Sequence, residues 1–326
     1  MNRKEYVRKI VLPSHPTKKS GHAWAPVNIA LCKYWGKRNE ELNLPTASSL
    51  SISLSKGTQT DISWHHGKDQ IFLSDQMLLS TDPFAVRLTS FLDLFRPDAD
   101  FGFVVKTANE VPTKAGLASS ASGFAALTLA LNDLFDWKLS NKNLSLLARV
   151  GSGSACRSIE KGFVLWTRGL SDDGLDSYAE KLSLSWPDLC LGLLLVDSGE
   201  KAVGSKEGML RTQKTSKLYP QWPMIVEEDI IEIQECIKKR DFASFGHIVE
   251  SNALTMHATM LSAWPPLMYL SEKSLSLLKI IWKWREDGLL VYASMDAGPN
   301  IKLFYQALDK EKVMKAFPNL IEVDLH

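Results

Sequence analysis

The feature that most constrains the fold is a change of pattern near residues 190–225. Before it, segments that alternate between apolar and polar residues, as half-buried strands do, are separated by polar loops. Residues 189–197 (LCLGLLLVD) lack this alternation and are typical of a strand buried on both faces. After the change, helical periodicity dominates, at about 226–240, 242–261 and 271–287. Two α+β domains that meet near the change are therefore expected.

We expect an N-terminal domain over residues 21–195 and a C-terminal domain over 196–326, preceded by a mobile or loosely attached extension over 1–20. Residues 61–75 (DISWHHGKDQIFLSD) predict a hairpin with its turn near Gly67. The polar stretch 199–223, rich in Gly, Ser and Lys, is expected to be a lid, a linker or a binding loop.

Composition argues against several classes of protein. The 38 basic and 37 acidic residues give a formal charge of +1, so there is no global electrostatic case for nucleic-acid binding. The sequence contains no apolar run of membrane-spanning length, and residues 1–21 lack the apolar centre of a signal peptide. The histidines have no metal-ligand spacing. Buried, reduced thiols of a cytoplasmic protein are expected at Cys32, Cys156, Cys190 and Cys236.

A cationic segment follows the first predicted strand, in residues 25–54. It carries Asn28, Lys33, Tyr34 and Lys37 between apolar and small residues, and a Ser/Thr run follows. Cations on such a loop suit an anionic ligand, whereas a solvated basic turn is the alternative for these residues alone.

A second segment, VPTKAGLASSASG at 111–123, leads into an apolar helix. Small residues allow a ligand to approach the backbone, and the free N–H groups of a helix start attract phosphate. Tight helix packing is the alternative explanation of such a run.

A third segment, RVGSGSACRS at 149–158, offers serine hydroxyls, backbone donors and Arg157. This combination suits a phosphate or carboxylate, with a capped helix and an exposed arginine as the alternative.

A fourth segment, SMDAGPNIK at 294–302, places Asp296 after an apolar strand and before a Gly-Pro turn. A carboxylate there can orient or deprotonate a substrate hydroxyl if a cation lies nearby. A turn-forming aspartate bonded to the following backbone is equally consistent with the segment.

Together the four segments resemble those of the diphosphomevalonate decarboxylases, within the superfamily that includes galactokinase, homoserine kinase and mevalonate kinase. The matches run in the family's order from about residue 23 to 305, and NIA…KYWGKR with GSGSACR is the most specific pair. The resemblance implies a two-domain α+β fold of the GHMP-kinase type. Its N-terminal domain would be like ribosomal protein S5 domain 2, its C-terminal domain a ferredoxin-like α/β sandwich, and its active site would lie in the interdomain cleft.

The activity that this resemblance implies is that of an ATP- and Mg²⁺-dependent carboxy-lyase. Members of the family phosphorylate the tertiary hydroxyl of mevalonate 5-diphosphate and then release phosphate and CO₂, which yields isopentenyl diphosphate and ADP. A cytoplasmic homodimer with this small-molecule substrate is expected, without nucleic-acid or membrane partners.

Site residues also follow from the resemblance. Asp296 would orient or deprotonate the hydroxyl, Lys33 would keep that carboxylate ionised, Arg157 would hold the substrate carboxylate, and Asn28 would complete the catalytic set. The substrate diphosphate is expected to contact Tyr34, Lys37, Ser152, Gly153, Ser154, Ser205, Lys206 and Met209. The ATP phosphates are expected to contact Gly116, Leu117, Ala118, Ser119, Ser120 and Ser122. Mg²⁺ is expected mainly on those phosphates, with Ser119 or Ser120 beside it.

Three alternatives stay open on the same fold: a kinase that phosphorylates a mevalonate compound and stops, a decarboxylase of the monophosphate, and a catalytically silent ligand-binding regulator. Retention of Lys33, Arg157 and Asp296 argues against the kinase, and retention of Asp296 and the phosphate segment argues against the silent protein. The family's usual asparagine is replaced by Ala47, which predicts the loss of one hydrogen bond near the site.

Overall fold

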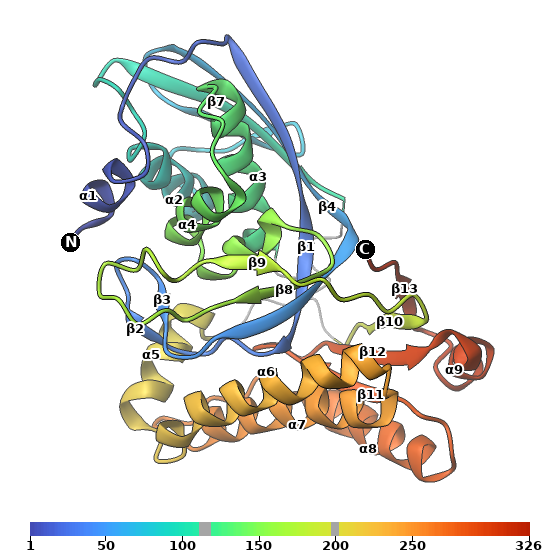
Figure 1. Cartoon of the computed structure of the whole chain (residues 1–326). Helices are drawn as coiled ribbons and strands as arrows, with labels where there is room; N and C mark the ends of the chain where they lie inside the picture. The colour runs from blue at the N-terminus through green and yellow to red at the C-terminus, as the bar shows by residue number, and fades with distance from the viewer. Residues whose placement is uncertain (111–118, 197–201) are drawn as a thin grey trace.

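Two β-sheets organise the computed structural model, which describes residues 1–110, 119–196 and 202–326 (Figure 1). The larger sheet runs β6-β5-β7-β4-β8-β9, with β1 paired to β4. Its strands are β1 (Ser20–Cys32), β4 (Ser49–His66), β5 (Gln70–Leu73), β6 (Gln76–Met77), β7 (Phe101–Asn109), β8 (Phe163–Trp166) and β9 (Ala179–Lys181). The second sheet runs β11-β12-β10-β13 and consists of β10 (Leu189–Leu194), β11 (Tyr292–Met295), β12 (Ile301–Gln306) and β13 (Ile321–Val323). A short ribbon pairs β2 (Lys37–Asn39) with β3 (Leu44–Pro45).

Helices from the first half cover one face of the larger sheet (Figure 1). They are α1 (Arg3–Arg8), α2 (Pro83–Leu92), α3 (Ser119–Leu134) and α4 (Asn141–Gly151). The apolar helix expected after the small-residue run is α3, and it packs against β1 and β4. Because a Cβ at Gly21 would lie 2.3 Å from the carbonyl oxygen of Ala130, only glycine allows β1 to come this close to the helix.

The predicted helices of the second half are confirmed as α6 (Trp222–Lys239), α7 (Phe242–Leu261) and α8 (Glu272–Glu286), and α9 (Lys310–Ala316) follows later. Between α6 and α7 the chain reverses at Arg240, whose φ of 54° is left-handed and ends the first helix. Asp241 then caps the second helix by accepting from the Ser244 N–H.

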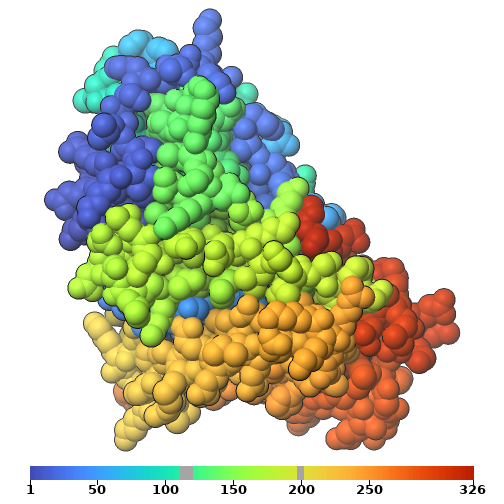
Figure 2. Space-filling model, in the orientation of Figure 1, coloured from blue at the N-terminus to red at the C-terminus, as the bar shows by residue number. Residues whose placement is uncertain are grey.

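One apolar core joins the two halves of the molecule. It combines buried residues of β1 and β4 with residues of β10, α6 and α7. In Figure 2 the yellow-green surface of the first half lies directly against the orange helices of the second. The two halves are therefore held together by apolar packing as well as by polar contacts.

The prediction of a hairpin at residues 61–75 was wrong. The chain does turn at Gly67, but β7 lies between β4 and β5, pairing antiparallel with the first and parallel with the second. The nine residues of β7 match β4 from Thr58 to His66, a longer ladder than the four-residue β5 can offer. β4 therefore pairs with the strand that offers the longer ladder, β7, and not with β5, the next strand in the sequence.

The polar stretch 199–223 contains a helix, where a lid, linker or loop was expected. Its helix α5 (Ser205–Thr215) begins after Gly204 and buries Met209 and Thr212. The predominance of polar residues reflects a helix that is buried along one side only.

The expectation of a mobile or loosely attached extension is contradicted in α1. Tyr6 and Val7 are 0% and 1% exposed, and the buried Arg149 guanidinium donates to Tyr6 Oη at 2.8 Å. Asn2 caps the helix through a capping box with Glu5.

The boundary between the halves lies before β10. This strand, expected at the end of the first domain, pairs with β12 and β13 of the second sheet. Within the described ranges, no helix has both the length and the apolar character needed to cross a membrane.

Candidate active site

The centre of the site is a carboxylate held between two lysines. Asp296 follows β11, and its Oδ1 accepts from Lys33 Nζ at 2.9 Å while its Oδ2 accepts from Lys302 Nζ at 2.8 Å. Both lysine side chains are 2% exposed, whereas that of Asp296 is 35% exposed. The two buried lysines thus hold the carboxylate in place, while its exposed part is still accessible to a ligand. Lys33 directly follows β1 and Lys302 lies in β12, so both halves of the molecule contribute.

The charges around Asp296 decide its protonation. Burial alone would raise the pKa of Asp296, but the ammonium groups of Lys302 and Lys33 together hold it well below its usual range. Burial also lowers the pKa of Lys33, and the attraction of Asp296 opposes that effect. Asp296 is therefore ionised and is a weak proton acceptor, which favours orientation over deprotonation of a hydroxyl.

A buried histidine supports the backbone at the same position. The imidazole of His257, 3% exposed on α7, lies with Nε2 3.1 Å from the carbonyl oxygen of Asp296. Because a carbonyl can only accept, Nε2 carries the proton. Burial lowers the pKa of His257 to about 4, so the ring is neutral near pH 7.

The backbone of Lys33 is held from the second half of the chain. Its N–H donates to Asn252 Oδ1 at 2.8 Å, and Asn252 in turn donates to Asp229 Oδ2 at 2.7 Å. The Lys33 ammonium also donates to the Ala30 carbonyl at 2.8 Å. Helices α6 and α7 therefore position the end of β1.

Arg157 and Asn28, both predicted as catalytic, are bonded to each other. Asn28 Oδ1 accepts from Nε and Nη2 of Arg157 at 3.3 and 3.2 Å, while Nη1 donates to Ser49 Oγ at 2.5 Å. The guanidinium is 3% exposed and lies over the Trp166 ring, 5.8 Å from its centroid. In the described part of the chain its hydrogen bonds go to neutral acceptors, so its charge stays available for an anion.

Tyr34 and Gly153, both predicted to contact the substrate diphosphate, lie next to each other. The Tyr34 hydroxyl is buried and has no hydrogen-bond partner among the described residues. A Cβ at Gly153 would lie 2.7 Å from that hydroxyl, so a larger residue there would have to displace the Tyr34 ring. Ser152 and Ser154 flank this glycine and are half-buried. A buried hydroxyl without a partner is costly unless a ligand or water completes it.

Lys37, in the first half of the chain, lies close to the start of α5, in the second half. Lys37, Lys206 and Met209 line one small pocket together with Glu40, Leu210 and Gln213. Burial, aided by Lys206, lowers the pKa of Lys37 to about 8, which the arrival of an anion would reverse. Ser205, the first residue of α5, is half-buried beside this pocket-lining turn.

Asn43 fixes the Lys37 side chain. Its Oδ1 accepts from Lys37 Nζ at 2.6 Å, and its Nδ2 donates to the carbonyls of Arg149 and Val150 at 2.9 and 3.1 Å. With a φ of 52°, Asn43 occupies a left-handed conformation that asparagine tolerates better than most residues. Asn43 thus ties Lys37 to the end of α4, just before the segment with Gly153.

The predicted phosphate segment is described only in part. Gly116, Leu117 and Ala118 lie outside the described residues, and Ser119 begins α3. Ser120 is half-buried, whereas Ser122 is fully buried with its hydroxyl 2.7 Å from Thr58 Oγ1. Within the described ranges, no group of three or more His, Cys, Asp or Glu side chains could hold a metal ion.

Sequence reasoning missed Lys302, Asn43 and His257. The signal for Lys302 was available, because a lysine between Ile301 and Leu303 in an apolar strand needs a buried anion. Asn43 and His257 carried no comparable local pattern.

Two further expectations can be compared with the structure. Ala47 lies in the apolar core, 4% exposed, where a polar side chain would need a partner. Cys32 and Cys156 are buried as expected, but Cys190 and Cys236 are only half-buried.

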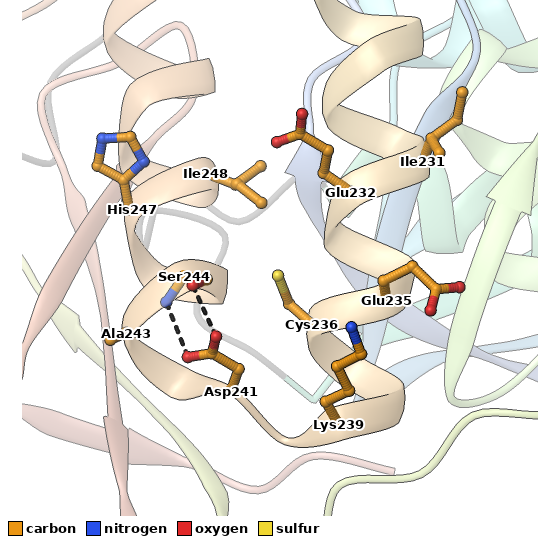
Figure 3. A pocket seen from close by; sticks show the side chains of 10 residues that line it. All are labelled: Ile231, Glu232, Glu235, Cys236, Lys239, Asp241, Ala243, Ser244, His247 and Ile248. Carbon is orange, nitrogen blue, oxygen red and sulfur yellow. Dashed lines mark hydrogen bonds between the residues drawn. The ribbon is translucent and has the colours of Figure 1, made fainter.

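A separate surface depression lies between α6 and α7 (Figure 3). Its wall includes Cys236 and His247, and Asp241 accepts there from Ser244 N and Oγ. None of the predicted site residues lines it.

Comparisons with known proteins cover both halves of the chain. Residues 25–179 match the diphosphomevalonate decarboxylase-like N-terminal domain, and residues 192–324 match the mevalonate 5-diphosphate decarboxylase C-terminal domain. The gap between the two matches contains the boundary inferred from β10.

Individual relatives agree with these domains. A diphosphomevalonate decarboxylase of Aspergillus fumigatus is 37% identical over 312 residues, which are 89% of this chain and 77% of that protein. Mevalonate diphosphate decarboxylase of Staphylococcus aureus has a solved structure with a TM-score of 0.88 and 37% identity, covering 94% of this chain and 96% of that one. A structure described as MDDEF in complex with MVAPP, AMPPCP and magnesium gives a TM-score of 0.86 and 41% identity, with the same coverages of 94% and 96%. Sequence, fold and site agree that this chain belongs to the diphosphomevalonate decarboxylase family, with the two-domain, mixed α/β architecture of the GHMP kinases.

Proposed function

We propose that this protein catalyses the ATP-dependent decarboxylation of mevalonate 5-diphosphate to isopentenyl diphosphate, with ADP, phosphate and CO₂ as the other products. The observation that carries this proposal is the ionised Asp296, one-third exposed, between Lys33 and Lys302 in a chain of this family. A related structure contains MVAPP, an ATP analogue and magnesium, which supports the same ligands here.

The charge of the site suits such a substrate. Among the described residues, the buried cations Lys33, Lys302 and Arg157 surround one carboxylate, that of Asp296, and Lys37 adds a fourth cation in the neighbouring pocket. A substrate with a carboxylate and a diphosphate compensates this excess of positive charge.

Asp296 orients the substrate in the proposed reaction. Its exposed edge accepts a hydrogen bond from the tertiary hydroxyl and turns that oxygen toward the phosphoryl donor. The γ-phosphoryl group of ATP moves to this oxygen as its bond to ADP breaks, and the hydroxyl proton passes to an oxygen of the transferred group. Phosphorylation makes the oxygen a good leaving group. The C–O bond then breaks with its electron pair leaving on phosphate. The bond to the carboxylate carbon supplies the pair that forms the double bond, and CO₂ departs.

The two ends of the substrate have separate contacts in this proposal. Asn28 accepts from the Arg157 guanidinium and the Trp166 ring packs against it, so its orientation is fixed. In this orientation the planar guanidinium binds the substrate carboxylate. The unpartnered Tyr34 hydroxyl, the donors of residues 152–154 and the cations Lys37 and Lys206 receive the diphosphate. Magnesium would be held mainly by ATP phosphates near the start of α3, with Ser119 or Ser120 beside it.

The experiment that tests the function follows ADP and CO₂ together in a mixture of protein, ATP, Mg²⁺ and mevalonate 5-diphosphate. Equal amounts of both products are expected. ADP without CO₂ would favour the kinase, preference for the monophosphate would favour the shorter substrate, and neither product would favour the silent regulator.

The first prediction concerns Asp296→Asn. This nearly isosteric change removes the negative charge between Lys33 and Lys302, so turnover should fall by at least about 10³-fold, because orientation of the hydroxyl is lost. ATP binding, measured by calorimetry, should persist. Near wild-type release of CO₂ by this variant would show that Asp296 does not act in the reaction.

We also propose a cytoplasmic homodimer, on the family resemblance alone. Light scattering of the purified protein tests the oligomeric state, and a monomeric mass would contradict it.

A further inference from the structure

Lys302, the second lysine on Asp296, adds positive charge to the site but contacts no part of the substrate in the proposed function. Lys302 lies in β12 between Ile301 and Leu303, which are fully buried, and is itself 2% exposed. Burying an ammonium group is costly unless a charge partner compensates it. The charge partner is Asp296, whose Oδ2 lies 2.8 Å from Lys302 Nζ.

One lysine would suffice to pair with this carboxylate. Lys33 already donates to Oδ1 at 2.9 Å, from the other half of the molecule. Lys302 therefore leaves the group with a net positive charge and directs each carboxylate oxygen to a different ammonium. The carboxylate is held by one donor on each oxygen, and 35% of the Asp296 side chain remains exposed.

Because Lys302 is buried behind Asp296, it acts on the substrate through that carboxylate. We propose that Lys302 is a positioning residue that, with Lys33, clamps Asp296 as an ionised hydrogen-bond acceptor and prevents it from acting as the base for the substrate hydroxyl in the ground state. This proposal rests on the proposed function for its substrate, but the clamp itself is a property of the protein alone.

The groups that face Asp296 are few in the described part of the chain. Lys33 approaches from the end of β1, Lys302 from β12 and the neutral His257 from α7, while the Arg157 guanidinium on the segment Gly153–Ile159 attracts it from further away. The neutral imidazole contributes no charge, so the two lysines dominate the affinity of the carboxylate for protons.

The test is the variant Lys302→Met, which keeps the length of the side chain and removes its charge. We expect the acidic limb of the kcat/KM profile to move upward by about 1–3 pH units, the range for loss of one adjacent opposite charge. Lys302→Arg should restore the wild-type profile. A structural role alone would lower activity at all pH values without moving the limb, and that outcome would overturn the proposal.

Ser294→Ala is the matched control. Ser294 is the strand partner of Lys302, is fully buried and has a hydroxyl without a hydrogen-bond partner among the described residues. The substitution changes the same place in the sheet without touching the charge, so its pH profile should match the wild type.

A second measurement does not depend on the substrate. The Asp296 carboxyl carbon is assigned by ¹³C NMR as the signal missing from Asp296→Asn, and its titration is followed in folded Lys302→Met and in wild type. An upward shift of the titration supports the clamp even if mevalonate 5-diphosphate is not the substrate. An unchanged titration in the folded variant overturns it, whatever the activity.

Discussion

At the scale of single residues, the site depends on neutral groups as much as on charged ones. His257 is a clear case, since its neutral ring donates to the Asp296 carbonyl from a position that is 3% exposed. An imidazolium there would face the ammonium groups of Lys33 and Lys302. The site therefore needs a histidine that resists protonation, and folding must supply the energy that keeps it neutral.

The pH dependence of stability follows from this histidine. The pKa of His257 is about 4 in the folded protein against 6.5 as the ordinary value, so the unfolded chain takes up its proton first as the pH falls. The contribution of the neutral His257 to the free energy of unfolding is fully present above pH 6.5 and is lost progressively as the pH falls to about 4. Between about pH 7 and pH 4.5 this single group should remove about 2 kcal/mol of the free energy of unfolding.

Urea unfolding of His257→Gln at the two pH values measures this contribution. Glutamine can still donate to the Asp296 carbonyl but does not titrate, so the difference between the two pH values should shrink by about 2 kcal/mol relative to wild type. An unchanged difference would mean that His257 is not the group responsible.

At the scale of elements, periodicity predicted α6, α7 and α8, because each buries apolar residues that recur at helical spacing in its own sequence. It could not predict that β7 would separate β4 from β5, since strand partners are chosen by long-range register. For the same reason the role of Lys302 was missed. The lysine was visible, but its neighbour Asp296 depends on the pairing of β12 with β11.

The N-terminal helix shows a second limit of local patterns. Four of the six residues of α1 are charged, yet its Tyr6 is buried and accepts a hydrogen bond from Arg149, 143 positions away in the chain. Arg149 also donates to the carbonyls of Leu42, Gly174 and Ser177, so Tyr6 completes a fully buried guanidinium.

Tyr6→Phe and Tyr6→Ala test whether α1 belongs to the folded body. Loss of the hydroxyl leaves one guanidinium donor unpaired and should cost about 1–3 kcal/mol in free energy of unfolding. Loss of the whole ring should cost about 3–5 kcal/mol. Leu12→Ala, 74% exposed in the same N-terminal stretch, is the control and should leave stability unchanged in urea unfolding. Equal, small effects of all three would restore the view of a loosely attached extension.

At the scale of the whole molecule, the candidate site exists only when the two halves are together. Lys33 comes from the first sheet and Asp296 from the second, and the apolar core is continuous between them. The C-terminus also returns to the first half, where Ser55 N donates to Asp324 O at 2.9 Å and His326 N donates to Ser53 O at 3.0 Å. The motifs in the sequence identified both sets of residues, but only the packing explains how they reach each other.

This continuity predicts that the halves unfold as one unit. Trp222, fully buried at the start of α6, donates from Nε1 to the carbonyl of Trp35 at 3.0 Å and so joins the second half to the segment that follows Tyr34. Trp222→Ala should lower the free energy of unfolding by about 3–5 kcal/mol. Because the core is shared, hydrogen exchange in β4 and in β12 should accelerate together at increasing urea. Trp284→Ala, on the outer side of α8 at 39% exposure, should change neither strand. Acceleration confined to β12 would show that the halves are separate folding units, and the shared core would then contribute little to holding Lys33 against Asp296.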